Sequence, residues 1–212
     1  MFSKMTKIWM SVLALLLLTT TVAGKPPGAS QDKPPRKKTN LNQKDRQAWR
    51  KILKWSQECD DAYGDHGEDA AGLWFYQLAA RKYLVEVECE VAAYQSEMLY
   101  LLYDENASPA RSRLLTFKIY TGETEQSMKH IETGLLLGES TFDDQRKTLT
   151  VFYRLSRLGA CGTVATYSFP RGVPMLTDFR VKFACDGEGE EDKSGWKRIG
   201  PSGAKPSRRR GR

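Results

Sequence analysis

Three short β-prone runs between Thr148 and Cys185 constrain the fold of this chain more than any other feature. The runs read TLTVFYRL, TVATYSF and LTDFRVKFAC, and the turn-like segments SRLGACG and PRGVPM separate them. Short runs of β-branched and aromatic residues bounded by Gly and Pro are typical of strands joined by tight turns. The stretch therefore predicts an antiparallel meander.

The last two runs of this meander are predicted to pair as a hairpin around the loop Pro170–Met175. If Phe169 faces Leu176, then Cys161 lies one residue away from facing Cys185. Opposed Cβ atoms on antiparallel strands lie about 4.5–5.5 Å apart, and a disulfide needs about 3.5–4.5 Å. The register therefore predicts a bridge between these two cysteines.

The first residues have the order of a secretory signal peptide. A short basic region, Met1–Lys7, precedes the apolar run Ile8–Leu18, and the small residues Val22–Gly24 follow. This order predicts a signal peptide over residues 1–24 and a secreted or periplasmic protein. A membrane anchor or a buried helix at the N-terminus is the alternative, although the run is shorter than the roughly 20 residues that span a bilayer. We expect no transmembrane segment in the mature chain.

All four cysteines lie in the part predicted to be exported: Cys59, Cys89, Cys161 and Cys185. An even number of cysteines in a secreted chain predicts two disulfides. Three pairings are possible, and the hairpin register favours Cys59–Cys89 with Cys161–Cys185. If all four are bridged, no thiol is left to act as a nucleophile.

The net charge of +7 belongs to the ends of the chain. Residues 40–192 carry 18 basic and 25 acidic residues, a net charge of −7, whereas residues 25–39 carry +4 and residues 193–212 carry +8. We predict a disordered, basic, Pro-rich linker over 25–39, a single disulfide-bonded domain over 40–199, and a disordered basic tail over 200–212. An acidic domain argues against specific nucleic-acid binding.

A single N-terminal helix is predicted to begin at the N-cap Asn40. Its apolar face carries Trp49, Ile52 and Leu53 and continues to Ser56. Four basic residues lie mostly off that face and are predicted to be solvated: Arg46, Arg50, Lys51 and Lys54.

Strands dominate the rest of the predicted domain. Tyr83–Val91 alternates, so its valines and Cys89 are predicted to face the core and Glu86, Glu88 and Glu90 to form an outer acidic row. The other predicted strands are Leu73–Leu78, Glu97–Tyr103, Leu114–Tyr120, Gly134–Gly138 and Ser140–Asp143. Between them, Thr121–Ile131 is predicted to be irregular. We predict a mainly β (α+β) fold, an antiparallel β-sandwich or curved sheet with one N-terminal helix and two disulfides.

No motif in the sequence predicts a catalytic or metal site. Cys59–Gly72 reads as an acidic, solvated loop and lacks the residue order of an EF-hand calcium loop. His66 and His130 stand outside any zinc or hydrolase motif. We therefore expect no cofactor and no metal, and an enzyme is the less favoured class.

The C-terminal arginines are the candidate ligand-binding residues that the sequence offers. A tail with this much positive charge attracts polyanions or anionic surfaces, and the residues concerned are Arg208, Arg209, Arg210 and Arg212. A tail that only improves solubility is the alternative interpretation.

Several segments together resemble a bacterial exported family catalogued as domain-of-unknown-function family 1176. They are RKILKWSQEC, LVEVECEVAAY, YLLY, RLGACG and FRVKFAC, within Asn40–Trp196. Ala160 stands where the family pattern has Asp, and Gln95 where it has Asn. The resemblance implies secretion, paired cysteines and no established reaction.

These observations predict an exported, non-catalytic domain that binds a protein or an envelope polymer. Two alternatives stay open. One is an envelope hydrolase that uses acidic residues, and the other is polyanion binding through the basic C-terminal tail.

Overall fold

The computed structural model describes residues 45–64, 71–91, 95–186 and 192–200. All of them belong to the larger of two compact units, Lys33–Arg212, and the smaller unit, Met1–Asp32, lies outside the described residues. The predicted signal peptide, the linker, the Asn40 cap, His66 and the four C-terminal arginines also lie outside the described ranges.

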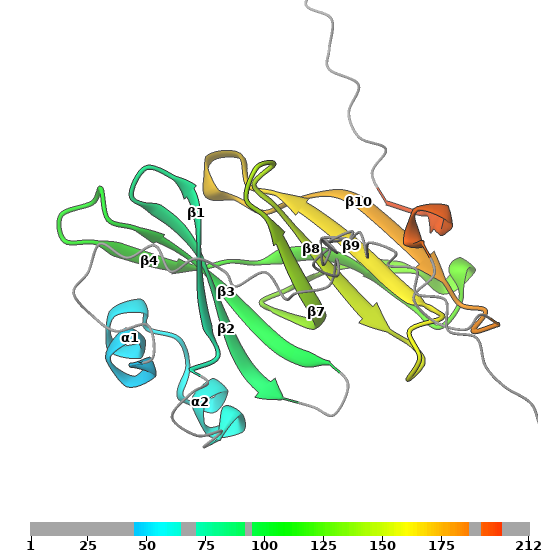
Figure 1. Cartoon of the computed structure of the whole chain (residues 1–212), viewed down its shortest axis with the longest axis horizontal. Helices are drawn as coiled ribbons and strands as arrows, with labels where there is room; N and C mark the ends of the chain where they lie inside the picture. The colour runs from blue at the N-terminus through cyan, green and yellow to red at the C-terminus, as the bar shows by residue number, and fades with distance from the viewer. Residues whose placement is uncertain (1–44, 65–70, 92–94, 187–191, 201–212) are drawn as a thin grey trace, which may run out of the picture. The chain divides into compact units, whose positions relative to one another are not determined.

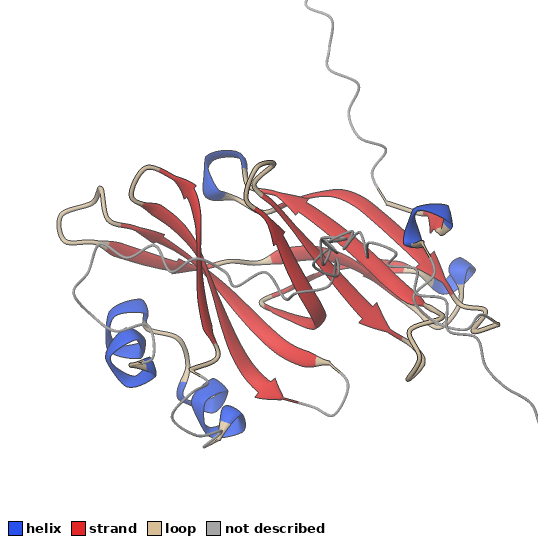
Figure 2. Cartoon of the chain, in the orientation of Figure 1, coloured by secondary structure: helices blue, strands red, loops and turns tan. Residues whose placement is uncertain are grey.

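Strands make up most of the described chain (Figures 1 and 2), so the prediction of a mainly β fold is confirmed. The main sheet contains β1 (Leu73–Ala79), β2 (Lys82–Val91), β3 (Ser96–Asp104), β4 (Arg111–Leu114), β7 (Leu135–Asp143), β8 (Thr148–Arg154), β9 (Gly162–Ser168), β10 (Met175–Lys182) and β11 (Lys197–Arg198). Its order is β1-β2-β3-β7-β8-β9-β10-β11, with β4 also paired to β3. A separate hairpin contains β5 (Phe117–Thr121) and β6 (Lys129–Thr133). Every described strand pair is antiparallel.

Strand β7 joins the two parts of the main sheet. It pairs with β3 through Leu135–Gly138 and with β8 through Glu139–Asp143. Gly138 has φ +137°, and a Cβ at this position would lie 2.4 Å from the backbone oxygen of Phe152. Only glycine fits there without moving the backbone, because L side chains avoid this conformation and the neighbouring strand is too close. The two strands predicted around this glycine are therefore one strand that changes partner.

Two hydrophobic clusters lie on opposite faces of β1–β3. The larger cluster joins β1–β3 to β7–β10 and β5, and its fully buried aromatic residues are Tyr100, Phe117, Tyr167 and Phe179. The smaller cluster packs the other face against the helices, where Trp49 contacts Phe75 and Tyr103 at ring-centroid distances of 4.6 and 5.8 Å. Strands β1–β3 are therefore covered on both faces.

The predicted outer acidic row of β2 is wrong at Glu86, because both faces of β1–β3 are covered. Glu86 is 1% exposed and faces the larger cluster. Its Oε2 accepts hydrogen bonds from the Tyr76 hydroxyl (3.2 Å) and the Ser140 hydroxyl (2.8 Å). Burial, followed by the nearby Glu86 carboxylate, raises the pKa of Tyr76 far above its ordinary value. Glu90, near the end of the strand, is exposed as predicted.

Two short helices precede the sheet, where the sequence predicted one. α1 (Arg46–Leu53) begins after Asp45, whose side chain accepts a hydrogen bond from the Ala48 N–H, and it ends at the left-handed residue Lys54. Ser56 therefore lies beyond the helix and is exposed, whereas the prediction placed it on the apolar face. α2 (Gln57–Tyr63) occupies the start of the predicted acidic loop. No helix in the described ranges is long and apolar enough to span a membrane.

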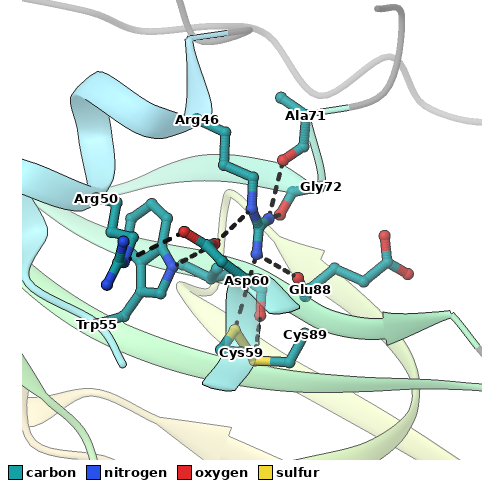
Figure 3. The surroundings of a disulfide bond; sticks show 10 residues. Arg46, Arg50, Trp55, Cys59, Asp60, Ala71, Gly72, Glu88 and Cys89 are labelled. Atoms are coloured by element: carbon teal, nitrogen blue, oxygen red, sulfur yellow. Dashed lines mark hydrogen bonds and ion pairs between the residues drawn. A yellow bond between two sulfur atoms is a disulfide. The ribbon is translucent and has the colours of Figure 1, made fainter. Parts of the chain in front are cut away.

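The basic side chain of Arg46 is not solvated, contrary to the prediction. Figure 3 shows its guanidinium group between α2, the start of β1 and the Cys59–Cys89 disulfide. It donates to Asp60 Oδ1 (2.8 Å) and to the carbonyl oxygens of Ala71 (3.0 Å) and Glu88 (2.9 Å). It also lies 4.1 Å from the centre of the Tyr63 ring. Asp60 binds Arg50 (3.2 Å) and Trp55 Nε1 (2.8 Å) as well, so this network fixes both helices to the sheet.

Both predicted disulfides are present in the structure, Cys59–Cys89 and Cys161–Cys185. The predicted β9–β10 register is wrong by one or two residues, because Leu176 pairs with Tyr167, not with Phe169. Phe169 leaves the ladder before the 3₁₀ turn η2 (Pro170–Gly172), and β10 then carries a bulge between Leu176 and Asp178. Cys161 directly precedes Gly162, which pairs with Lys182, and Cys185 follows Lys182 after a short extension, which brings the two Cα atoms to 4.8 Å.

The segment between β3 and β7 also differs from its prediction. The strand predicted over Leu114–Tyr120 is broken, because β4 ends at Leu114 in the main sheet and β5 begins at Phe117 in the separate hairpin. The segment predicted to be irregular, Thr121–Ile131, contains the 3₁₀ turn η1 (Glu125–Ser127) and the start of β6. The chain therefore leaves the sheet here, forms the hairpin and returns as β7.

Candidate functional site: an apolar cleft beside the β5–β6 hairpin

A cleft of about 280 Å³ lies between the β5–β6 hairpin and strands β7–β10. The hairpin side is formed by Ile119, Tyr120, Thr121, Gly122 and Met128. The sheet side is formed by Leu136, Leu137, Val151, Tyr153, Leu155, Thr163, Ala165, Tyr167, Phe179 and Phe183. Its volume is close to the lower end of the range for small-molecule sites, about 300–1,000 Å³, and such sites are also mainly apolar.

The hairpin borders the cleft because only a few of its residues pack on the sheet. Phe117 is fully buried in the larger cluster, while most of β6 is exposed. The Tyr167 hydroxyl donates to the Lys118 carbonyl oxygen (3.2 Å), and the ring of Tyr120 lies 5.1 Å from that of Phe179. At the far end of the hairpin, Lys197 of β11 forms an ion pair with Glu125. These contacts hold the hairpin over the sheet and leave the space beneath it unfilled.

A small side chain contributes to the floor of the cleft. Ala165 of β9 pairs with Val151 of β8 on one side and with Phe179 of β10 on the other, and all three line the cleft. The methyl group of an alanine fills little of the space between larger neighbours on a sheet face. The sequence therefore leaves a depression at the centre of this face.

The rim of the cleft is also apolar. Leu155 at the end of β8 is 44% exposed, and Leu137 of β7 is similarly exposed. The hydroxyl-bearing residues that line the cleft are Tyr120, Thr121, Tyr153, Thr163 and Tyr167. No carboxylate, imidazole or thiol occurs among the described residues that line the cleft, so these residues supply apolar contact and a few hydrogen bonds.

The second disulfide supports one end of the cleft. The Leu155 N–H donates to the Cys161 carbonyl oxygen at 3.1 Å, and Phe183 lies two residues before Cys185. Two lining residues are thus held through the Cys161–Cys185 bridge. We expect that bridge to fix the width of the cleft as well as to stabilise the fold.

The four C-terminal arginines that the sequence offered as candidates, and His66, lie outside the described residues, so among the singled-out residues only the histidine on β6 can be placed against this cleft. His130 lies on β6 with its ring 5.2 Å from that of Tyr120, and it does not line the cleft. The described residues contain no cluster of three or more His, Cys, Asp or Glu side chains that could hold a metal ion. The cleft was not predicted from the sequence. The available signal is the pair Leu136–Leu137, because consecutive leucines in an alternating strand place apolar groups on both of its faces.

A comparison with protein families gives one match. The family model described as "Protein of unknown function (DUF1176)" matches residues 21–196 of the chain. No curated protein and no solved structure matches the chain. A function must therefore be argued from the geometry of the fold.

Proposed function

Since the chain belongs to the DUF1176 family of proteins of unknown function, we propose from its geometry that it is an exported, non-catalytic binding domain. In this proposal the cleft beside the β5–β6 hairpin holds an apolar group of the ligand. The ligand is a small molecule or the exposed part of an envelope component.

The observation that carries this proposal is the apolar lining of a cleft that is already open. Its floor and walls are formed mainly by aliphatic and aromatic side chains, and its rim exposes Leu137 and Leu155 to water. Burying such a surface against a ligand is favourable by roughly 25 cal/mol per Å² of apolar area. No carboxylate, imidazole or thiol occurs among the described lining residues, which supports binding over catalysis.

Export is the second part of the proposal, and two features support it. The N-terminal order of basic, apolar and small residues is that of a signal peptide. All four cysteines are paired in disulfides, which persist in oxidising compartments such as the periplasm. Fractionation of cells that express the full chain, followed by mass determination of the mature protein, tests this part.

The binding part is tested with N-phenylnaphthylamine, a neutral dye that fluoresces in apolar surroundings. Leu155 and Leu158 lie three residues apart and form a matched pair, because both are exposed (44% and 68%) and only Leu155 lines the cleft. We expect the wild-type chain to bind the dye, Leu155→Asp to weaken binding about tenfold or more, and Leu158→Asp to bind as the wild type does. A charge at the rim must be desolvated by an apolar ligand, which gives this direction.

Two results would overturn the proposed cleft. Absence of dye binding by the folded wild-type protein is one. Equal effects of the two aspartate variants are the other, because they would place the dye outside the cleft.

A further inference from the structure

A second pocket shares Tyr120 with the cleft. It is lined by Lys118 and Tyr120 of β5, His130 of β6, and Pro170, Arg171, Val173, Pro174, Met175 and Leu176 around the η2 turn. Val173 and Met175 are large apolar residues that remain exposed in this pocket. The pocket therefore combines apolar contact surface with basic groups from three separate segments.

The charge of this pocket is opposite to that of the domain. Residues 40–192 carry a net charge of −7, yet the pocket is lined by Lys118, Arg171 and His130 and by no described carboxylate. Lys118 forms an ion pair with Glu132 at 3.7 Å. Both side chains of that pair are more than half exposed, and exposed pairs of this kind contribute little, so the ammonium group remains available to a ligand.

Arg171 is held in an unusual conformation at this site. Its backbone has φ 55° and ψ 24°, the left-handed region that non-glycine residues adopt infrequently. The next residue, Gly172, also has positive φ, and a Cβ there would lie 2.7 Å from a side-chain atom of Leu102. The Gly172 carbonyl oxygen accepts a hydrogen bond from Arg113 (3.3 Å). The turn that carries Arg171 is thus fixed against the main sheet.

Aromatic rings connect the second pocket to the cleft. Tyr120 lines both spaces. Its ring lies 5.1 Å from Phe179, which belongs to the cleft, and 5.2 Å from His130, which belongs to the second pocket. The two spaces therefore share Tyr120 as a common wall, and this is the observation that joins them in the inference below.

We infer that the domain binds an amphipathic anion, with its hydrocarbon part in the cleft and its oxyanion headgroup between Lys118, His130 and Arg171. This inference rests on the proposed function, because it adds a headgroup site to the apolar cleft. An arginine fork and a lysine ammonium together suit the oxygen atoms of a carboxylate or a phosphate. The apolar residues Val173 and Met175 would contact the part of the ligand nearest its headgroup.

The test compares ligands that share a chain and differ in their headgroup. Decanoate, decyl phosphate and decanol, each below its aggregation concentration, compete with N-phenylnaphthylamine on the full mature chain. We expect decanoate or decyl phosphate to bind about tenfold more tightly than decanol at low salt, since charge-assisted hydrogen bonds favour the anion. Whichever of the two anions binds more tightly identifies the headgroup as a carboxylate or a phosphate. Added salt should reduce this preference and leave decanol binding unchanged.

Variants locate the headgroup. The double variant Lys118→Gln/Arg171→Gln should lose the preference for the anion and retain decanol binding. Arg146→Gln is the matched control, because Arg146 is exposed and does not line the pocket. Arg171→Lys keeps the charge and should retain part of the preference.

The outcomes separate the two claims. If no ligand displaces the dye and the dye itself does not bind, the proposed cleft fails and the headgroup site fails with it. If decanol and the anions bind equally, or if the double variant keeps the full preference, the headgroup site alone is overturned. Loss of the preference in Arg146→Gln would also overturn it, because the effect would then reflect net charge.

Discussion

Replacement of Arg46 by lysine is the most direct test of how the helices are fixed to the sheet. The side chains of Arg46 and Asp60 are only 11% and 9% exposed, so solvent does little to replace their interactions. Lysine keeps the positive charge next to Asp60. Its single ammonium group cannot donate hydrogen bonds at the same time to Asp60, Ala71 and Glu88, as the planar guanidinium group does. The carbonyl oxygens of Ala71 and Glu88 would each lose a charged donor.

The magnitude follows from these contacts. Losing the donors to two partly buried carbonyl oxygens costs about 1–1.5 kcal/mol each, so Arg46→Lys should lower the free energy of unfolding by about 2–3 kcal/mol. Arg46→Met also removes the charge opposite Asp60, and breaking a buried ion pair costs about 3–5 kcal/mol. Asp60 would still bind Arg50 and Trp55, which places the methionine variant near the lower end of that range.

Urea unfolding of the oxidised protein, followed by tryptophan fluorescence, measures these changes. A loss of 2–3 kcal/mol corresponds to a decrease in Tm of about 5–10 °C for a domain of this size. Arg146→Lys is the matched control, because Arg146 is 83% exposed and should change stability by no more than about 0.5 kcal/mol. If Arg46→Lys is no more destabilising than this control, the account of the Arg46 network is wrong.

Three further predictions follow from the described contacts. Ala165→Leu should fill the floor of the cleft, weaken dye binding and leave the domain at least as stable, as urea unfolding and dye titration would show. Replacement of both Cys161 and Cys185 by serine should weaken dye binding, because Leu155 and Phe183 would lose the disulfide that supports both of them. Circular dichroism checks that the variant remains folded, and unchanged dye binding by the folded variant would contradict the prediction. The pKa of Tyr76 is raised by burial above its ordinary value of 10.0, so the folded state binds the proton more tightly and stability should fall as the pH rises above about 10. Tyrosinate absorbance measured against pH checks this, and titration of all tyrosines with ordinary pKa values in the folded protein would refute it.

The sequence predicted those features that depend on local pairing. The bridge between Cys161 and Cys185 was predicted because its cysteines flank one hairpin, and a register error of one or two residues did not separate them. The strands were located by their β-branched and aromatic residues. The predicted break around Gly138 was wrong, because a glycine inside a strand can mark a bend as well as an end.

The features that were not predicted from the sequence depend on which elements cover each face of a strand or helix. Alternation in β2 shows that Glu86 lies on the opposite face of the strand from Val85 and Val87. It does not show whether that face contacts solvent or a second layer of the protein. In the same way, the basic residues of α1 lie off its apolar face, and only the position of α2 reveals that Asp60 reaches Arg46. Glu86 is buried by strands that are distant in the sequence, such as β7 with Ser140. Arg46 is buried by α2, which lies outside the predicted helix.

The same difference in coverage explains why the cleft lies where it does. Strands β1–β3 are covered by helices on one face and by β5 and β7–β10 on the other, so their side chains fill the available space. The inner face of β8–β10 is covered only in part by the hairpin, which packs through Phe117 and a few neighbours. A larger residue at position 165 would fill this space at little cost, since unfilled apolar volume reduces stability. The small side chain at the floor and the exposed leucines at the rim are therefore features that the proposed binding of an apolar ligand would account for.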